Sequence, residues 1–385
     1  MRKTEHIGVI GAGSMGAGIA QVAATAGCKV TLFDQQKSAA ISALDKLSSI
    51  LDRLVKKERI SNDKRNDILS LITVVDDLNQ FHSADLVIEA IVEDIDIKKK
   101  LFFNLESIVA EDCVLATNTS SLSVTDLASS CEKSSRFIGI HFFNPAPLMP
   151  LVEVIPALQT DSSLVENTLD LLNSWEKIPV VAKDTPGFIV NRIARPFYGE
   201  ALRIYEEGLA DFKSIDEAIK TIGGFKMGPF ELMDFIGNDV NYAVTASVFK
   251  AFYYDPRYKP SFTQKQHAEA GWLGRKTGRG YYNYESDLDL KSSISNDQSV
   301  EIFERVLVML INEAVDALFL KIASEKDIEL AMMKGVNYPK GLISWGREKG
   351  FDWCEQKLDE LYNIYHEDRY RCSPLIRKWA AEIKS

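Results

Sequence analysis

The turn GAGSMG carries three glycines at the spacing G-x-G-x-x-G, directly after the apolar run HIGVI (6–10). The first glycine of such a turn permits a tight bend, the second lets the backbone approach a pyrophosphate, and the third allows a helix to pack closely on the strand. The amino end of that helix faces the phosphates. The residues expected to contact the cofactor here are Gly11, Ala12, Gly13, Ser14, Met15 and Gly16. A dinucleotide site is indicated, although such glycines can also serve only to form a turn.

Asp34 narrows the choice of dinucleotide. It ends the next expected strand, KVTLFD (29–34), at the distance from the turn that is typical of the motif. A carboxylate at this point accepts hydrogen bonds from the ribose 2′-hydroxyl and repels a 2′-phosphate. We therefore expect NAD rather than NADP as the cofactor.

A histidine and a glutamate are candidates for proton transfer. His141 lies near the end of the expected strand RFIGIHF (136–142), and imidazole titrates near neutral pH, as a general base must. Glu153 lies in the apolar run LVEVIP (151–156), and the loop Asn-Pro-Ala-Pro between the two strands could return it to His141. A carboxylate there would fix the imidazole tautomer and stabilise the imidazolium. Taken singly, His141 could be a hydrogen-bonded core residue and Glu153 a solvated one.

Ser120 is a third candidate. It follows the expected strand CVLATNT (113–119), near the carboxyl edge of the sheet, where doubly wound folds bind ligands. Its hydroxyl could bond a substrate oxygen and the cofactor. The alternative is a serine that only caps the next helix, with Ser121 or Ser123 at the helix start.

Five longer motifs resemble those of the L-3-hydroxyacyl-CoA dehydrogenases. In order along the chain they are TNTSSLSVTDLA (117–128), GIHFFNPAPLMPLVEVIP (139–156), DTPGFIVNRI (184–193), MGPFELMD (227–234) and GRKTGRGYYNY (274–284). The resemblance extends to about residue 284, and the remainder is similar to longer bacterial members with a repeated C-terminal domain. It implies NAD-dependent oxidation of a 3-hydroxyacyl-CoA to the 3-ketoacyl-CoA, in fatty acid β-oxidation or short-chain acyl-CoA metabolism.

The resemblance also implies roles for single residues. His141 and Glu153 match the catalytic pair, and Ser120 and Asn191 match residues that hold the substrate. Four further positions match cofactor contacts, and for them surface charge or loop capping is the alternative: Glu93, Lys98, Asn144 and Lys276. Lys57 matches a lysine that contacts CoA, but a neighbouring serine of the family is Ile50 here, which leaves the CoA position along this helix open.

The composition excludes several classes of protein. Of the 385 residues 46% are hydrophobic and 26% charged, and the net charge is −10, which argues against a general nucleic-acid binder. No apolar run approaches the roughly 20 residues of a membrane-spanning helix, and the N-terminus lacks the layout of a signal peptide. The five cysteines and five histidines are scattered, so neither a disulfide framework nor a metal site is expected. We expect a cytoplasmic protein without membrane or nucleic-acid partners.

The elements that position these residues alternate in type. Further strands are expected at DLVIEA (85–90) and PVVAK (179–183), and runs that are apolar on both faces favour parallel strands between helix layers. We predict a doubly wound Rossmann-type NAD domain over 1–185. An all-α domain over 186–284 follows, then a polar linker over 285–299.

The last segment, 300–385, is predicted to be a second, degenerate copy of the helical domain. Glu200-Ala201 aligns with Glu313-Ala314, and aligning Asp216 with Asp327 requires a two-residue gap. In this alignment Glu304 stands opposite Asn191, so we expect the second copy to be structural. It could cover a face that shorter relatives bury by forming homo-oligomers. Chance resemblance between amphipathic helices is the alternative.

Two other functions are open to this sequence. One is another NAD-linked hydroxyacid dehydrogenase, of the 6-phosphogluconate or 3-hydroxyisobutyrate type, although those enzymes work through a lysine in a different motif. The other is an NAD-binding protein with little activity, which the presence of Ser120, His141, Glu153 and Asn191 makes unattractive.

Overall fold

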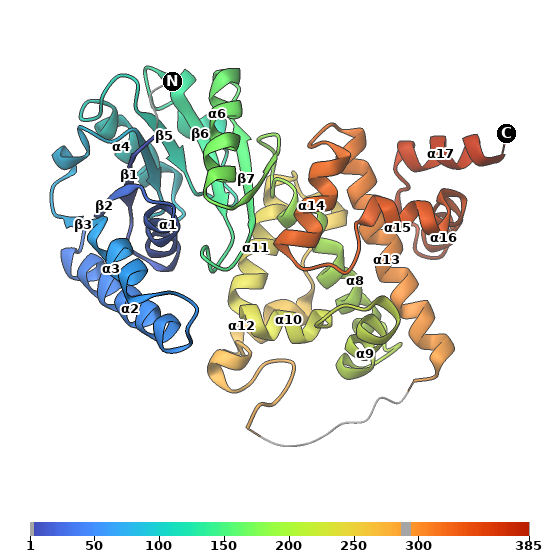
Figure 1. Cartoon of the computed structure of the whole chain (residues 1–385). Helices are drawn as coiled ribbons and strands as arrows, with labels where there is room; N and C mark the ends of the chain where they lie inside the picture. The colour runs from blue at the N-terminus through green and yellow to red at the C-terminus, as the bar shows by residue number, and fades with distance from the viewer. Residues whose placement is uncertain (1–3, 286–293, 385) are drawn as a thin grey trace. The chain divides into compact units, whose positions relative to one another are not determined.

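The computed structural model describes residues 4–285 and 294–384 of the chain (Figure 1). The chain divides into two compact units, which we call the sheet unit (Met1–Thr185) and the helical unit (Pro186–Ser385). Over the described residues, each helix is either too short or too polar to cross a bilayer.

The sheet unit contains eight strands in the order β3-β2-β1-β4-β5-β6-β7-β8. Their bounds are β1 His6–Ile10, β2 Lys29–Phe33, β3 Ile72–Val75, β4 Leu86–Glu89, β5 Val114–Thr117, β6 Phe137–Phe142, β7 Leu151–Pro156 and β8 Ile178–Val181. Neighbouring strands are parallel except β6 and β7, which pair antiparallel. The strand order reverses between β1 and β4, so the predicted doubly wound sheet is confirmed.

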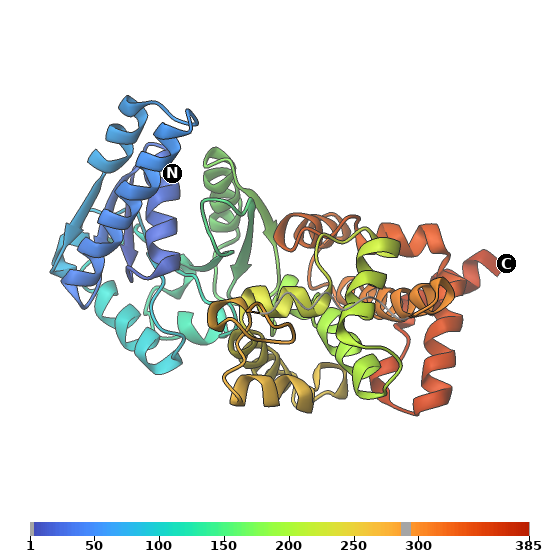
Figure 2. The ribbon, with the colours of Figure 1, turned by 90° about the horizontal axis from the view of Figure 1, so that it is seen from below.

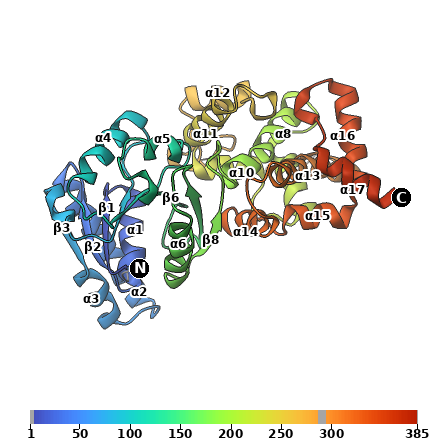
Figure 3. The same cartoon turned by 90° about the horizontal axis from the view of Figure 1, so that it is seen from above.

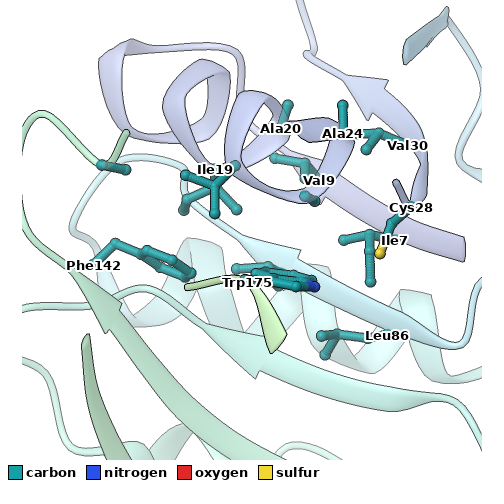
Figure 4. Close-up of a cluster of buried hydrophobic side chains, with 14 of the residues drawn as sticks. Ile7, Val9, Ile19, Ala20, Ala24, Cys28, Val30, Leu86, Phe142 and Trp175 are labelled. Carbon is teal, nitrogen blue, oxygen red and sulfur yellow. The ribbon is translucent and has the colours of Figure 1, made fainter. Parts of the chain in front are cut away.

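Helices cover both faces of this sheet. They are α1 Ser14–Thr25, α2 Lys37–Lys56, α3 Asn62–Ser70, α4 Ile95–Glu106, α5 Val124–Ala128 and α6 Ser162–Ser174, with short 3-10 turns η1 Leu78–Phe81 and η2 Ser134–Arg136. In Figure 2 the blue helices lie on one side of the strands and the cyan helices on the other. Ile19 of α1 packs with Val9, Phe142 and Trp175 in the core beneath the blue helices (Figure 4). This core fixes α1 against the strands that carry the candidate site.

Over the described residues, the helical unit consists of α-helices and short 3-10 turns. The segment up to residue 285 contains α7 Val190–Ile193, α8 Arg195–Glu206, α9 Phe212–Gly223, α10 Pro229–Ile236, α11 Asn238–Ala251, η3 Pro256–Tyr258, α12 Phe262–Glu269 and η4 Arg275–Thr277. The segment from residue 294 contains α13 Asn296–Phe319, α14 Glu325–Gly335, α15 Leu342–Lys349, α16 Phe351–Tyr365, η5 Asp368–Tyr370 and α17 Pro374–Lys384. We call these the first and second helical segments. The long helix α13 packs against α8 and α9 (Figures 1 and 3).

The expected linker lies partly outside the described residues, because 286–293 are not described. Its last residues are helical, since α13 begins at Asn296. The reason is local: the Ser295 hydroxyl accepts from the Gln298 N–H and the Gln298 side chain accepts from the Ser295 N–H, which together cap the helix.

Backbone conformation relates the two helical segments residue by residue. Four positions with positive φ in the first segment have counterparts with positive φ in the second, all at one constant separation in the sequence: Gly208 with Lys321, Gly224 with Asn337, Gly237 with Gly350, and Tyr253 with His366. The same separation pairs Asp216, whose carboxylate accepts from the first N–H groups of α10, with Glu329, which does the same for α15. The two-residue gap that aligned Asp216 with Asp327 is therefore wrong. A longer acid performs the capping role in the second segment.

Candidate active site

Two glycines of the turn between β1 and α1 lie too close to neighbouring backbone atoms to be replaced by a residue with a Cβ. Gly11 has φ +99°, and a Cβ there would lie 2.4 Å from the Ala90 carbonyl oxygen. A Cβ on Gly16 would lie 1.8 Å from the Gly11 carbonyl oxygen. Only glycine fits either position, so the turn brings the start of α1 directly over the end of β1.

Gly13 differs, because a Cβ built on it meets nothing within 4 Å. It is the N-cap of α1, it contributes no side-chain cap, and the first turn of α1 carries no acidic residue. Open space above backbone N–H groups at the positive end of a helix is what a pyrophosphate requires. The turn thus fits the phosphates of NAD. Asn144 lies beside it, where its side-chain oxygen accepts from the Ser14 hydroxyl at 3.2 Å.

Asp34 stands next to this turn. Its carboxylate accepts from the Ala12 N–H at 2.8 Å and from the Gln36 N–H at 2.9 Å. These bonds hold a negative charge, partly exposed, at the end of β2. The position fits an acceptor for the adenosine ribose hydroxyls.

A polar network, partly exposed at Glu93, joins the carboxyl ends of β4 and β5. Glu93 Oε1 accepts from the Thr119 hydroxyl (2.5 Å), the Ser120 N–H (3.0 Å) and the Ser121 hydroxyl (3.0 Å), while Lys98 Nζ lies 3.3 Å from Glu93 Oε2. Burial acts to raise the pKa of Glu93, but Lys98 and the three donors outweigh it and hold that pKa below its usual range. Glu93, Lys98 and Ser120, predicted separately, are thus brought together. The cap of α5 is Ser123, which accepts from the Asp126 N–H, so the Ser120 hydroxyl does not serve as that cap.

Sequence reasoning missed the residue beneath this network. Glu89 is fully buried at the end of β4, and its carboxylate accepts from Lys98 Nζ (2.5 Å), the Ile91 N–H (2.7 Å) and the Thr117 hydroxyl (2.8 Å). Lys98, only 1% exposed, therefore lies between two carboxylates. A single acid at the end of the otherwise apolar run LVIE was the available signal.

His141 and Glu153 are direct partners in the antiparallel register of β6 and β7. His141 Nδ1 lies 2.8 Å from Glu153 Oε2, and the exposures are 6% and 0%. The Phe143 ring lies 4.6 Å from the imidazole. Nearby, the Phe142 N–H donates to the Asn118 side chain at 2.8 Å, which ties β6 to the end of β5. A carboxylate at Nδ1 fixes the tautomer and the orientation of the imidazole ring.

The remaining predicted residues lie on other elements. Lys57 is exposed at the end of α2. Asn191, in the helical unit, is half-buried on α7. Lys276, also in that unit, lies 2.6 Å from Asp239 Oδ1. No group of His, Cys, Asp and Glu suited to a metal ion was found over residues 4–285 and 294–384.

NAD-linked dehydrogenases combine a hydride acceptor with a proton acceptor. The sheet unit has the features of this class: a dinucleotide turn, an acid at the end of β2 and an imidazole–carboxylate pair on the same sheet.

Comparison with known proteins gives the family. Residues 6–185 match the family model "3-hydroxyacyl-CoA dehydrogenase, NAD binding domain", and residues 187–284 and 302–384 each match "3-hydroxyacyl-CoA dehydrogenase, C-terminal domain". The chain is 35% identical to Escherichia coli 3-hydroxyadipyl-CoA dehydrogenase over 99% of this chain and 98% of that one. It is 41% identical to the pig mitochondrial hydroxyacyl-coenzyme A dehydrogenase over 73% of this chain and 91% of that one. A crystal structure of E. coli 3-hydroxybutyryl-CoA dehydrogenase superposes with a TM-score of 0.94 at 35% identity, covering 99% of both chains.

The chain belongs to the 3-hydroxyacyl-CoA dehydrogenase family. It is an NAD-dependent oxidoreductase that acts on acyl-CoA thioesters.

Proposed function

We propose that His141 is the general base that removes the 3-hydroxyl proton of the substrate and, in reverse, the acid that returns it. Bound NAD supplies the hydride acceptor. The observation that carries this proposal is the 2.8 Å contact between His141 Nδ1 and the buried Glu153 carboxylate. Glu153 would fix the tautomer of the imidazole, with proton exchange at Nε2, and would stabilise the imidazolium that forms.

The same proposal assigns the ligand contacts. Ser120 would bond the substrate oxygen and NAD, Asn191 would help to hold the substrate, and Lys57 would contact a phosphate of CoA. The glycine turn (Gly11, Ala12, Gly13, Ser14, Met15, Gly16), together with Asp34, Glu93, Lys98, Asn144 and Lys276, would hold NAD. The network around Glu93 supports the assignment of Ser120, because it fixes the Ser120 backbone at the carboxyl edge of the sheet. Lys98 is buried between Glu89 and Glu93, which favours an indirect role in NAD binding: Lys98 would hold the Glu93 carboxylate in place rather than contact NAD itself.

The acyl group is open to direct test. One E. coli relative is named for the dicarboxylyl thioester 3-hydroxyadipyl-CoA, and the E. coli crystal structure is named for the short thioester 3-hydroxybutyryl-CoA. A substrate panel should therefore contain 3-ketobutyryl-, 3-ketoadipyl- and longer 3-ketoacyl-CoA. Loss of NADH absorbance with at least one of them, stopped by His141→Gln, is the expected result. Turnover only with 3-hydroxyisobutyrate or 6-phosphogluconate would contradict the proposal and favour the other hydroxyacid dehydrogenases. A place in fatty acid β-oxidation, or short-chain acyl-CoA metabolism, and a cytoplasmic location remain predictions.

We also propose that the helical unit is a duplicated domain, with copies over 186–284 and 300–385. The shared positive-φ positions and the packing of α13 on α8 and α9 support this. The second copy would cover a face that single-copy relatives bury by pairing two subunits. Light scattering on a truncation after residue 284 should show association or precipitation. A truncated chain that stays soluble in the oligomeric state of the full chain would contradict it.

A further inference from the structure

Asn191 lies on α7 (Val190–Ile193), a single helical turn that leads into α8 through Ala194, whose backbone is also helical. As the first turn of this stretch, α7 is held less firmly by helical hydrogen bonds than the turns that follow it. The chain enters it through two residues with positive φ, Gly187 (+73°) and Phe188 (+47°). The position of Asn191 therefore depends on what its neighbours contact.

Arg192, the next residue, is held by the second helical segment. Its Nε donates to Glu313 Oε1 at 2.6 Å and its NH2 to Asp316 Oδ2 at 3.2 Å, both on α13. Glu313 also accepts from the Tyr258 hydroxyl (2.5 Å) and from Arg257 (3.2 Å). Arg192 is 2% and Glu313 1% exposed. Two arginines face two acids, so this cluster is balanced in charge and its ion pairs are shielded from water.

A second arginine–acid cluster joins the same two segments, but here the arginine belongs to the second segment and the acid to the first. Arg305 of α13 donates through Nε to Glu200 of α8 at 2.7 Å, and the Tyr370 hydroxyl donates to Glu200 at 2.6 Å. Arg305 also binds both carboxylate oxygens of Glu207, at 2.7 and 2.9 Å. Arg192 and Glu200 of the first segment correspond to Arg305 and Glu313 of the second at the constant separation described above. Tyr258 and Tyr370 have the same role, as donors to Glu313 and Glu200, but lie one residue out of that alignment. The second cluster ties α13 to α8, and its ion pairs among residues 4–285 and 294–384 do not include α7.

We propose that Glu313 and Asp316 are positioning residues for substrate binding: through Arg192 they fix the α7 turn and hence the Asn191 side chain. The inference rests on the role proposed above for Asn191. It gives the second helical segment a part in the reaction although it lacks the Asn-bearing motif. Because the guanidinium is held at both Nε and NH2 and its stem is buried, the ion pairs restrain residue 192 relative to α13.

The two clusters supply a matched pair of variants. Glu313→Gln keeps the shape of the side chain but removes the charge that faces Arg192. Glu200→Gln makes the same change in the cluster that does not contact α7. Steady-state kinetics with the best 3-ketoacyl-CoA should show kcat/KM roughly 10- to 100-fold lower for Glu313→Gln, since a shift of about 1 Å at a binding group can cost that much. The KM for NADH should stay unchanged, and Glu200→Gln should keep wild-type kinetics. Equal kinetic effects of both variants, or none, would overturn the proposal.

Two further variants keep the test decisive. Asp316→Asn alters the partly exposed member of the cluster, so it should fold even if Glu313→Gln does not, and it should raise the KM for the thioester alone. If it folds with unchanged kinetics, the inference fails. Asn191→Ala tests the proposed function separately. Unchanged kinetics there would remove Asn191 from the site, whereas a defect in Asn191→Ala with normal Glu313→Gln and Asp316→Asn enzymes would overturn only the role of α13.

Discussion

His141 and Glu153 face each other across the antiparallel pair β6–β7, with Nδ1 2.8 Å from Oε2. Since the pair is fixed by strand register, replacing the imidazole should leave the sheet and the NAD site intact. We expect His141→Gln to lower kcat by about 10²- to 10⁴-fold, the usual contribution of a positioned general base. NADH binding, followed by fluorescence titration, should persist. Near-normal turnover would remove His141 as the base.

The glycines of the turn should separate folding from cofactor binding. A Cβ on Gly13 meets nothing within 4 Å, whereas one on Gly16 would strike the Gly11 carbonyl. Gly13→Ala should therefore unfold near the wild-type denaturant concentration but bind NADH more weakly, because its methyl group occupies the space that we assign to the pyrophosphate. Gly16→Ala should lose stability as well. Calorimetric titration and urea denaturation of both variants test this, and unchanged NADH affinity in Gly13→Ala would place the phosphates elsewhere.

Asp34 should control the choice between NAD and NADP. Asp34→Ser removes the negative charge but retains an oxygen for the neighbouring backbone donors, Ala12 and Gln36. The ratio of kcat/KM for NADP to that for NAD should rise, because a 2′-phosphate is no longer repelled. If the ratio is the same as in the wild type, another group sets the preference.

Lys98 should prove to be structural as well as functional. Lys98→Met would leave the buried Glu89 carboxylate without its ammonium partner, which we expect to cost about 3–5 kcal/mol in the free energy of unfolding. The loss of Lys98 should also raise the pKa of Glu93, which Lys98 helps to lower. The double variant Glu89→Gln/Lys98→Met should recover part of the stability. A double variant as unstable as Lys98→Met would show that the pair is not coupled.

The stability of the helical unit should decline in acid through Glu313. Burial acts to raise the pKa of this carboxyl, but Arg192, Arg257 and Tyr258 outweigh it and hold the pKa below its usual value. The unfolded chain then takes up the proton first as the pH falls. The contribution of Glu313 is thus complete above about pH 5 and is lost at lower pH. In denaturation experiments the difference between wild type and Glu313→Gln should shrink from pH 7 to pH 4, and a constant difference would contradict this.

The strands and the glycine turn were predictable because their signals are local: apolar runs and glycine spacing lie within a few residues. β3 (Ile72–Val75) was missed because four residues at the sheet edge, with Thr73 exposed, carry too little pattern. The Glu89–Lys98 pair depends on how α4 packs on the sheet, which no single stretch of sequence encodes. The false gap arose because Asp216 and Asp327 match as letters, whereas the capping role belongs to Glu329.

The two arginine–acid clusters of the helical unit, around Glu313 and around Glu200, bear on how such a protein can evolve. In an assembly of identical subunits every substitution appears on both sides of the contact. Where both partners are encoded in one gene, each side of the contact can change alone. Under the duplication proposed above, Arg192 could keep its acid on α13 while the position opposite Asn191 changed to Glu304, which pairs with Lys349. One copy would then be free to lose its substrate contact and to serve as a support for the other.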